Sequence, residues 1–197
     1  MKILAFSDLH ASHGRAIALV QASHEADLVI GAGDFCNMRT GLGDALALLS
    51  DISAPMVVVP GNAESADELR DAALSNMTIL HGEAHEVSGL SLFGLGYGVP
   101  PTPFGEWSCD LSETIAADML APCSSADILI THSPPKGVAD TTSGGLSVGS
   151  TAIHDAITRI QPQLAICGHI HDSWGRDGQI GTTRILNLGP TVNWLDF

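Results

Sequence analysis

The chain has 197 residues, of which 45% are hydrophobic and 15% are charged, so it can bury a core and is not intrinsically disordered. Its net charge of −14 comes from 22 acidic against 8 basic residues, with no basic run, which disfavours an extended nucleic-acid partner. No apolar run approaches the roughly 20 residues of a membrane helix, and the N-terminus lacks a signal-peptide layout, so we expect a cytoplasmic protein without a membrane partner.

The first third of the sequence alternates short apolar runs with helix-like segments. The runs predict strands over Ile3–Phe6, Leu28–Ala32 and Met56–Val59. The segments between and after them predict helices over Arg15–Ser23, Asp44–Leu49 and Ser65–Leu74. Three successive strand–helix units predict parallel strands joined by right-handed crossovers.

The middle of the sequence departs from this strand–helix alternation, which resumes toward the end. Glycine punctuates three short runs, Thr78–Leu80, His85–Val87 and Leu90–Leu95, which predicts antiparallel hairpin structure. Helices are predicted over Ser112–Leu120 and Thr151–Ile160, the second with Ser150 as its N-cap. The remaining predicted strands are Ile128–Thr131, Leu164–Cys167, Gln179–Gly181 and Arg184–Leu188. The pattern predicts one α/β domain over residues 1–197, with two sheets packed between helices.

Polar residues suited to metal binding follow five of the apolar runs. They are Asp8, His10, Asp34, Asn62, His132, His169 and His171. Ligand sites in open α/β sheets form beyond the carboxyl ends of the strands, so residues far apart in sequence can converge there. Each residue alone is compatible with a helix cap, a turn or a loop. Seven together favour a common site.

The chemical types in this set narrow the choice of metal. Two carboxylates, one amide oxygen and four imidazoles suit Mn, Fe, Zn or Co, and contain too much nitrogen for Mg or Ca. The four widely spaced cysteines form no Cys-x-x-Cys pair, which disfavours a thiolate zinc site or a disulfide framework. Asp8 and His10, like His169 and His171, would share one face of an extended segment. Seven ligands exceed what one tetrahedral ion accepts, so two ions are implied.

The charge of such a site points to a reaction. Two divalent ions bring four positive charges and Asp8 and Asp34 return two negative ones, which leaves about two positive charges for a hydroxide and an anionic substrate. A hydroxide that bridges the two metals could attack a phosphate ester in line. The set therefore favours a phosphoester hydrolase.

The order of these pieces resembles the calcineurin-like metallophosphoesterases. The pieces are Asp8-x-His10, Gly33-Asp34, Gly61-Asn62, His132 and Gly168-His169-x-His171, which span residues 8 to 171. The resemblance implies two mixed β-sheets packed as a sandwich flanked by helices, in four layers. It also implies that Asp8, His10 and His171 hold one metal, that Asn62, His132 and His169 hold the other, and that Asp34 bridges them. Manganese is the metal we expect first, with Fe, Zn or Co as alternatives.

One position departs from the family pattern. Where the family usually has Gly-Asn-His followed by an acid, this chain reads Gly61-Asn62-Ala63-Glu64. In the family that histidine contacts the phosphate and helps to protonate the leaving group, which alanine cannot do. General acid catalysis is worth ~10²–10⁴-fold, so we expect diesters or activated esters to be preferred over monoesters.

Three further residues have two readings each. His13 and Arg39 follow the first and second motifs and are candidates for substrate binding, although both also suit an exposed loop. Glu64 is either the acid of the third motif or part of the first turn of the next helix. The Pro-rich segment before Phe104 and Trp107 is compatible with a surface loop, a lid or a substrate wall.

These observations leave three functional hypotheses. The first is a phosphodiesterase acting on small phosphate esters. The second is a phosphomonoesterase or phosphatase, although the short chain lacks the insertions we expect around a protein-substrate groove. The third is a non-catalytic interaction module on the same fold, as in a retromer subunit with a degraded metal site. All seven ligand positions hold suitable residues, which favours an enzyme, while Ala63 is the one observation for the third hypothesis.

Overall fold

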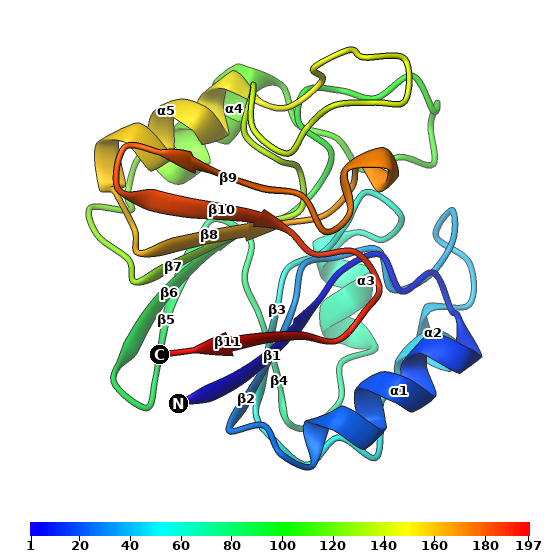
Figure 1. Cartoon of the computed structure of the whole chain (residues 1–197). Coiled ribbons are helices and arrows are strands. Elements are labelled where there is room, and N and C mark those ends of the chain that lie inside the picture. The colour runs from blue at the N-terminus through cyan, green and yellow to red at the C-terminus, as the bar shows by residue number, and fades with distance from the viewer.

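Two β-sheets lie face to face in the computed structural model, which describes residues 1–197 (Figure 1). The first sheet has five strands in the order β11-β1-β2-β3-β4. Their bounds are β1 (Lys2–Phe6), β2 (Leu28–Gly31), β3 (Met56–Val58), β4 (Met77–Ile79) and β11 (Asn193–Asp196). Strands β1 to β4 are parallel to their neighbours, and β11 pairs antiparallel with β1.

The second sheet has six strands in the order β5-β6-β7-β8-β10-β9. Their bounds are β5 (Glu83–Val87), β6 (Leu90–Leu95), β7 (Ile128–Thr131), β8 (Leu164–Cys167), β9 (Asp177–Ile180) and β10 (Thr183–Asn187). The four inner strands are parallel, and the edge strands β5 and β9 are antiparallel to their neighbours. Both sheets are therefore mixed, as the family resemblance implies.

Helices cover the outer face of each sheet (Figure 1). On the first sheet these are α1 (His13–Ser23), α2 (Leu42–Ala47) and α3 (Ala66–Asp71), and on the second they are α4 (Glu113–Leu120) and α5 (Thr151–Ile160). A short 3₁₀ helix, η1 (His171–Ser173), follows β8. The predicted α/β fold with two sheets between helices is confirmed. None of the helices is long and apolar enough to cross a lipid bilayer.

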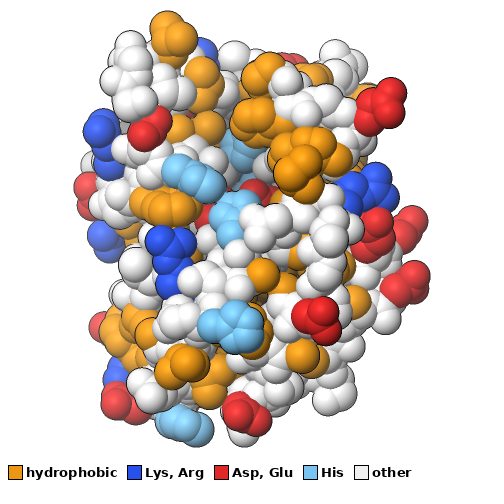
Figure 2. All heavy atoms as spheres, turned by 90° about the vertical axis from the view of Figure 1, so that its right-hand side faces the viewer, with side chains coloured by type: hydrophobic (Ala, Val, Ile, Leu, Met, Phe, Trp, Pro, Cys, Tyr) orange, Lys and Arg blue, Asp and Glu red, His pale blue; other side chains and the backbone are white.

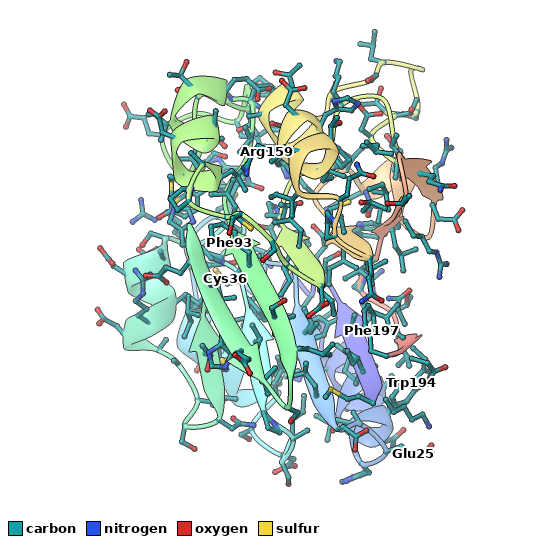
Figure 3. The ribbon with its side chains drawn as sticks, turned by 90° about the vertical axis from the view of Figure 1, so that its left-hand side faces the viewer. Glu25, Cys36, Phe93, Arg159, Trp194 and Phe197 are labelled. Atoms are coloured by element: carbon teal, nitrogen blue, oxygen red, sulfur yellow. The ribbon has the colours of Figure 1, made fainter.

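Alternation of side chains along the strands builds the layers. In β1, Ile3 and Ala5 point into the core between the sheets, whereas Leu4 and Phe6 pack against the helices of the first sheet. The second sheet repeats this, because Phe93 of β6 packs in the cluster that α4 and α5 cover. Arg159 of α5, labelled in Figure 3, lies between the two helices, and its guanidinium donates to the backbone carbonyls of Leu120 and Cys123 at the end of α4.

Two predictions about the strands need correction. The run at Thr78–Leu80 was expected in a hairpin, but β4 lies in the first sheet and is parallel to β3. Of the three runs, only the two that form β5 and β6 pair as an antiparallel hairpin. Strand β11 is not among the predicted strands; it pairs with β1 from the other end of the chain. The short run of β4 does not by itself distinguish a parallel from an antiparallel partner, and β11 pairs with the opposite end of the chain, which a local pattern of residues does not identify.

The helix boundaries follow local capping chemistry. Ser150 is the N-cap of α5, and its side chain accepts a hydrogen bond from Ile153 N, as predicted. Ser65 caps α3 in a capping box with Glu68. Glu64 therefore precedes the cap and does not belong to the first turn of the helix. This places its side chain in the loop between β3 and α3.

Candidate metal centre

The seven predicted ligand residues lie at one edge of the two sheets, where the parallel strands end. Asp8 and His10 follow β1, Asp34 follows β2, Asn62 follows β3, His132 follows β7, and His169 and His171 follow β8. Six of them form two groups whose ligand atoms lie within 4.8 Å of one another. The groups are Asp8, His10 and His171, and Asp34, His132 and His169. Figure 2 shows this face, with histidine side chains around a hollow near its centre.

The backbone at the site is not extended, contrary to the expectation for the two Asp/His-x-His motifs. Asp8, His10 and His169 have φ values of 53°, 48° and 67°, in the left-handed region. His169 and His171 therefore do not share one face as in an extended segment, and each joins a different group, as the family resemblance implies. Such conformations cost about 1–3 kcal/mol each, and persist where surrounding contacts hold them. Here Asp8 N donates to Gly33 O and His10 N donates to Asp34 O, both at 2.9 Å.

The motif glycines allow these loops to touch. A Cβ on Gly61 would lie 2.0 Å from Asp34 Oδ1, and a Cβ on Gly168 would lie 2.4 Å from Asp8 Oδ2. Both distances are far below van der Waals contact, so any side chain would push a carboxylate out of place. The glycine context of the motifs is therefore a packing requirement of the site.

Backbone carbonyls fix the orientation of two imidazoles. His132 Nδ1 lies 2.8 Å from Ala32 O, and His10 Nδ1 lies 3.1 Å from Cys36 O. A carbonyl oxygen can only accept a hydrogen bond, so Nδ1 carries the hydrogen and Nε2 presents a lone pair to the site. His10 Nε2 faces His171 Nε2 at 3.2 Å. Two facing ring nitrogens at this distance suit a shared cation.

Asn62 is aimed at the same point by a network from the loop after β6. Its amide nitrogen donates to Ser108 Oγ at 3.0 Å, and Ser108 Oγ donates to Asp110 Oδ1 at 3.0 Å. The amide oxygen is thereby left to face His132 Nε2 at 3.1 Å. Sequence reasoning did not find Ser108 or Asp110, because nothing local marks them as partners of a residue about 46 positions away.

Asp8 is held by three donors around the site. Its carboxylate accepts from His169 N at 3.0 Å, from Trp174 Nε1 at 3.1 Å and from Ser7 Oγ. The Trp174 ring also lies against His171, with 4.2 Å between ring centroids. Trp174 therefore packs against two of the candidate ligands, Asp8 and His171.

Two buried carboxylates, Asp34 and Glu64, lie one behind the other. Burial and the nearby charge of Asp8 raise the pKa of Asp34 to about 7. Burial and then the charge of Asp34 raise the pKa of Glu64 to about 7. Burial also holds the pKa of His169 well below its usual range. An imidazole whose charged form is disfavoured and mutually repelling carboxylates favour a cation among them, so the residues present fit a pair of metal ions.

Glu64 ties two of the motif loops together. Its Oε1 accepts from Asp34 N at 2.8 Å and from Gly61 N at 2.7 Å, and its Oε2 accepts from Phe35 N at 3.1 Å. The Asp34 loop and the Asn62 loop thus share one anchor beneath the candidate ligands. The capping box that begins at Ser65 is the sequence signal that separates Glu64 from the helix.

The two predicted substrate contacts lie elsewhere. The Arg39 guanidinium forms a bidentate pair with Glu68, with its closest contact at 2.8 Å. His13 is exposed at the first position of α1. Neither lines the hollow over the metal centre, whose ten lining residues include Asn62, Asp172 and Thr142.

The hollow has a volume of about 360 Å³ and one aromatic wall. Phe104 and Trp107 line it with their rings stacked at 5.7 Å and 6° between planes. The Pro-rich loop is thus a wall of the site. Ala63 is 2% exposed and does not line the hollow, while its backbone N donates to Asp34 Oδ1. The position of the family's histidine is therefore closed off by a buried methyl group.

Known proteins with similar sequences include a family of phosphoesterases and relatives from worm and human. The sequence profile of a family described as "Calcineurin-like phosphoesterase superfamily domain" matches residues 1–196. UPF0046 protein K07C11.7 of Caenorhabditis elegans is 27% identical over 209 residues, which cover 94% of this chain and 68% of that protein. Human metallophosphoesterase domain-containing protein 1 is 31% identical over 141 residues, which cover 68% of this chain and 40% of that protein.

Among solved structures, TT1561 of Thermus thermophilus superposes with a TM-score of 0.75 at 16% identity, covering 99% of this chain and 98% of that one. This likeness concerns the fold alone. The chain spans about two thirds of the worm protein and two fifths of the human protein. The profile match over nearly every residue shows that this chain belongs to the calcineurin-like phosphoesterase superfamily.

Proposed function

We propose that the protein hydrolyses small phosphodiesters with two divalent metal ions, manganese first among them, held by the seven side chains. The observation that carries the proposal is the approach of His132 Nε2 to Asn62 Oδ1 at 3.1 Å. In the neutral ring the hydrogen lies on Nδ1 and points to Ala32 O, so Nε2 and the amide oxygen both present lone pairs. Two facing lone pairs repel each other unless a proton or a metal ion lies between them, and a divalent ion would be bound by both atoms at once. When bound, two divalent ions supply Lewis-acid activation of water and of the phosphate.

The chain itself supplies positioning. Carbonyls Ala32 O and Cys36 O hold the two imidazoles in one tautomer, and Ser108 holds the Asn62 amide in one orientation. The stacked rings of Phe104 and Trp107 exclude water from one side of the hollow. A substrate phosphate would therefore meet a prearranged centre with one apolar flank.

The preference for diesters follows from Ala63. A monoester with a poor leaving group needs a proton donor at the leaving oxygen, and a methyl group offers none. A diester brings one negative charge instead of two, so it also places less anionic charge against Asp8 and Asp34.

A substrate panel tests this proposal. With Mn²⁺ present, we expect kcat/KM for bis(4-nitrophenyl) phosphate to exceed that for 4-nitrophenyl phosphate by about tenfold. A missing general acid costs at least about 10²-fold when the leaving group is poor, and 4-nitrophenolate is a good leaving group, so the difference expected here is smaller. The measurement is initial-rate release of 4-nitrophenolate with Mn²⁺, Zn²⁺, Co²⁺ and Fe²⁺ in turn. A higher value for the monoester would favour a phosphomonoesterase, and no hydrolysis of either ester with any metal would overturn the enzyme proposal.

Restoring the family's residue is the complementary test. In Ala63→His we expect kcat/KM for a monoester with a poor leaving group, such as phenyl phosphate, to rise about tenfold. The gain is smaller than a native general acid provides, because Ala63 is 2% exposed and the imidazole must displace its neighbours. Ala63→Asn serves as the control for size without a titratable group. Equal rates for the two variants would show that protonation is not what the chain lacks.

A further inference from the structure

A second hollow opens directly from the hollow over the metal centre. We call it the proline pocket; it has a volume of about 550 Å³. The two hollows share the side chains of Phe104, Thr142, His169 and Ile170. Because His169 is also one of the candidate metal ligands, the proline pocket begins at the metal centre itself. A phosphate group alone needs much less space than the two hollows offer together.

The proline pocket has an apolar part, formed mainly by prolines, and a polar part that contains Thr102, Thr142 and Ser147. Pro100, Pro101 and Pro103 form one side, and proline has a fixed φ and no backbone N–H. On the other side Gly149 lies so close to the chain that a Cβ there would meet Pro135 O at 2.6 Å. Asp140 holds this segment by accepting from Gly149 N at 2.9 Å and Gly137 N at 2.9 Å. A wall arranged in advance costs little ordering when a ligand binds.

One cationic side chain stands at this pocket. Lys136 lines it, and neither hollow has any other lysine or arginine. The Lys136 ammonium donates to one acceptor, Ser147 O, and no carboxylate lies within 4 Å of it. An ammonium has three N–H donors, so two remain for a ligand. The charge of Lys136 also acts on the buried Asp140 carboxylate, but without a direct ion pair, so its remaining donors are available to an anion in the pocket.

We propose that the proline pocket binds the second alcohol of the phosphodiester substrate, and that this alcohol carries an anionic group which pairs with Lys136. This inference rests on the proposed function and names its substrate class: a diester with a short apolar stem that ends in a carboxylate or a second phosphate. The proline wall contacts the stem, and the ammonium pairs with the terminal anion. Lys136 acts on substrate selection and takes no part in bond cleavage.

The kinetic test compares matched substrates. The charged substrates are 4-nitrophenyl ω-carboxyalkyl phosphates with three to five methylene groups, and the uncharged references are the methyl esters of the same carboxylic acids. In Lys136→Met, kcat/KM for the best carboxylate falls about tenfold, the loss of one charge-assisted contact, while the methyl esters change less than about twofold. Lys136→Arg keeps at least half of the preference. The control is Lys2→Met, which removes the only other lysine, paired with Glu25 away from both hollows, and leaves the preference unchanged.

A binding readout makes the test independent of turnover. Reductive ¹³C-dimethylation labels only Lys2, Lys136 and the N-terminal amine; it keeps their positive charge and leaves one N–H on each, so this readout tests charge pairing and not the number of hydrogen bonds. Titration with the ω-carboxyalkyl phosphate product should shift the Lys136 methyl signal and leave that of Lys2 in place. If the diesters are cleaved but carboxylate and methyl ester react alike and the Lys136 signal stays still, the inference fails and the proposed function stands. If no diester is cleaved with any metal, the proposed function fails instead.

Discussion

Replacement of Asp34 by asparagine should abolish tight binding of the metals and reduce kcat/KM for a diester by more than about 100-fold. Loss of a residue that only hydrogen-bonds to a metal ligand typically costs about 10–100-fold in metal affinity or activity. Asp34 is itself a candidate ligand and lies between the two ligand groups, so its loss should cost more. Its oxygens lie 3.5 Å from His10 Nε2 and 3.5 Å from His132 Nε2. Asparagine keeps the shape and an acceptor for Ala63 N, but removes the charge that a pair of cations needs.

The measurement is metal content by elemental analysis after gel filtration, together with initial rates. Asp118→Asn, an exposed acid on α4 with no hydrogen-bond partner, is the matched control and should keep both metal and activity. Metal-free Asp34→Asn should be no less stable than the metal-free wild type, since the amide removes a buried charge that repels Asp8. Full metal content in the variant would contradict the bridging position of Asp34.

Replacement of Glu64 by glutamine should lower the free energy of unfolding of the metal-free protein by about 2 kcal/mol. Each carboxylate oxygen faces two backbone N–H groups: Oε1 faces Asp34 N and Gly61 N, and Oε2 faces Phe35 N and Cys36 N. The glutamine NH₂ group is a donor, and in either orientation of the amide it faces two backbone N–H groups, which are also donors. The amide avoids the cost of burying a charge, and this offsets part of the loss.

Urea unfolding with EDTA at about pH 8, above the raised pKa of Glu64, measures this effect. The pKa of Glu64 is higher in the folded than in the unfolded state, so its contribution to stability weakens as the pH rises from about 4.5 through 7. Glu86→Gln on β5, exposed and without a hydrogen bond, is the matched control and should change stability by less than about 0.5 kcal/mol. An unchanged unfolding midpoint in Glu64→Gln would show that the loops do not depend on this anchor.

The fold was predictable where a local pattern carries the information. The alternation of Ile3–Phe6, a helix and Leu28–Ala32 indicates parallel strands, and β1 and β2 pair in that way. The hairpin of β5 and β6 follows from short runs with a turn between them. Strand β4 was assigned to the hairpin because a short glycine-flanked run has no local mark of its partner. Its partner β3 lies about twenty residues earlier.

The candidate site divides in the same manner. The chemistry of a ligand is a property of one residue, and the position after an apolar run is a property of a few, so the sequence gathers Asp8, His132 and His171 as candidates. The partner of Arg39 could not be read from its sequence neighbours, because its guanidinium forms an ion pair with Glu68 of α3. The same holds for Ser108, which acts on Asn62 through a hydrogen bond.

The sequence by itself determined the α/β class, the first three strand–helix units and the residue types that meet at one edge of the sheets. Only the tertiary structure decided that Glu64 anchors two loops, that Ser108 orients Asn62, and that a second pocket with Lys136 adjoins the centre. The physical reason is distance along the chain. Side-chain chemistry and periodicity are local, whereas the contact of His169 N with Asp8 Oδ1 joins residues 161 positions apart and exists only once both sheets have formed.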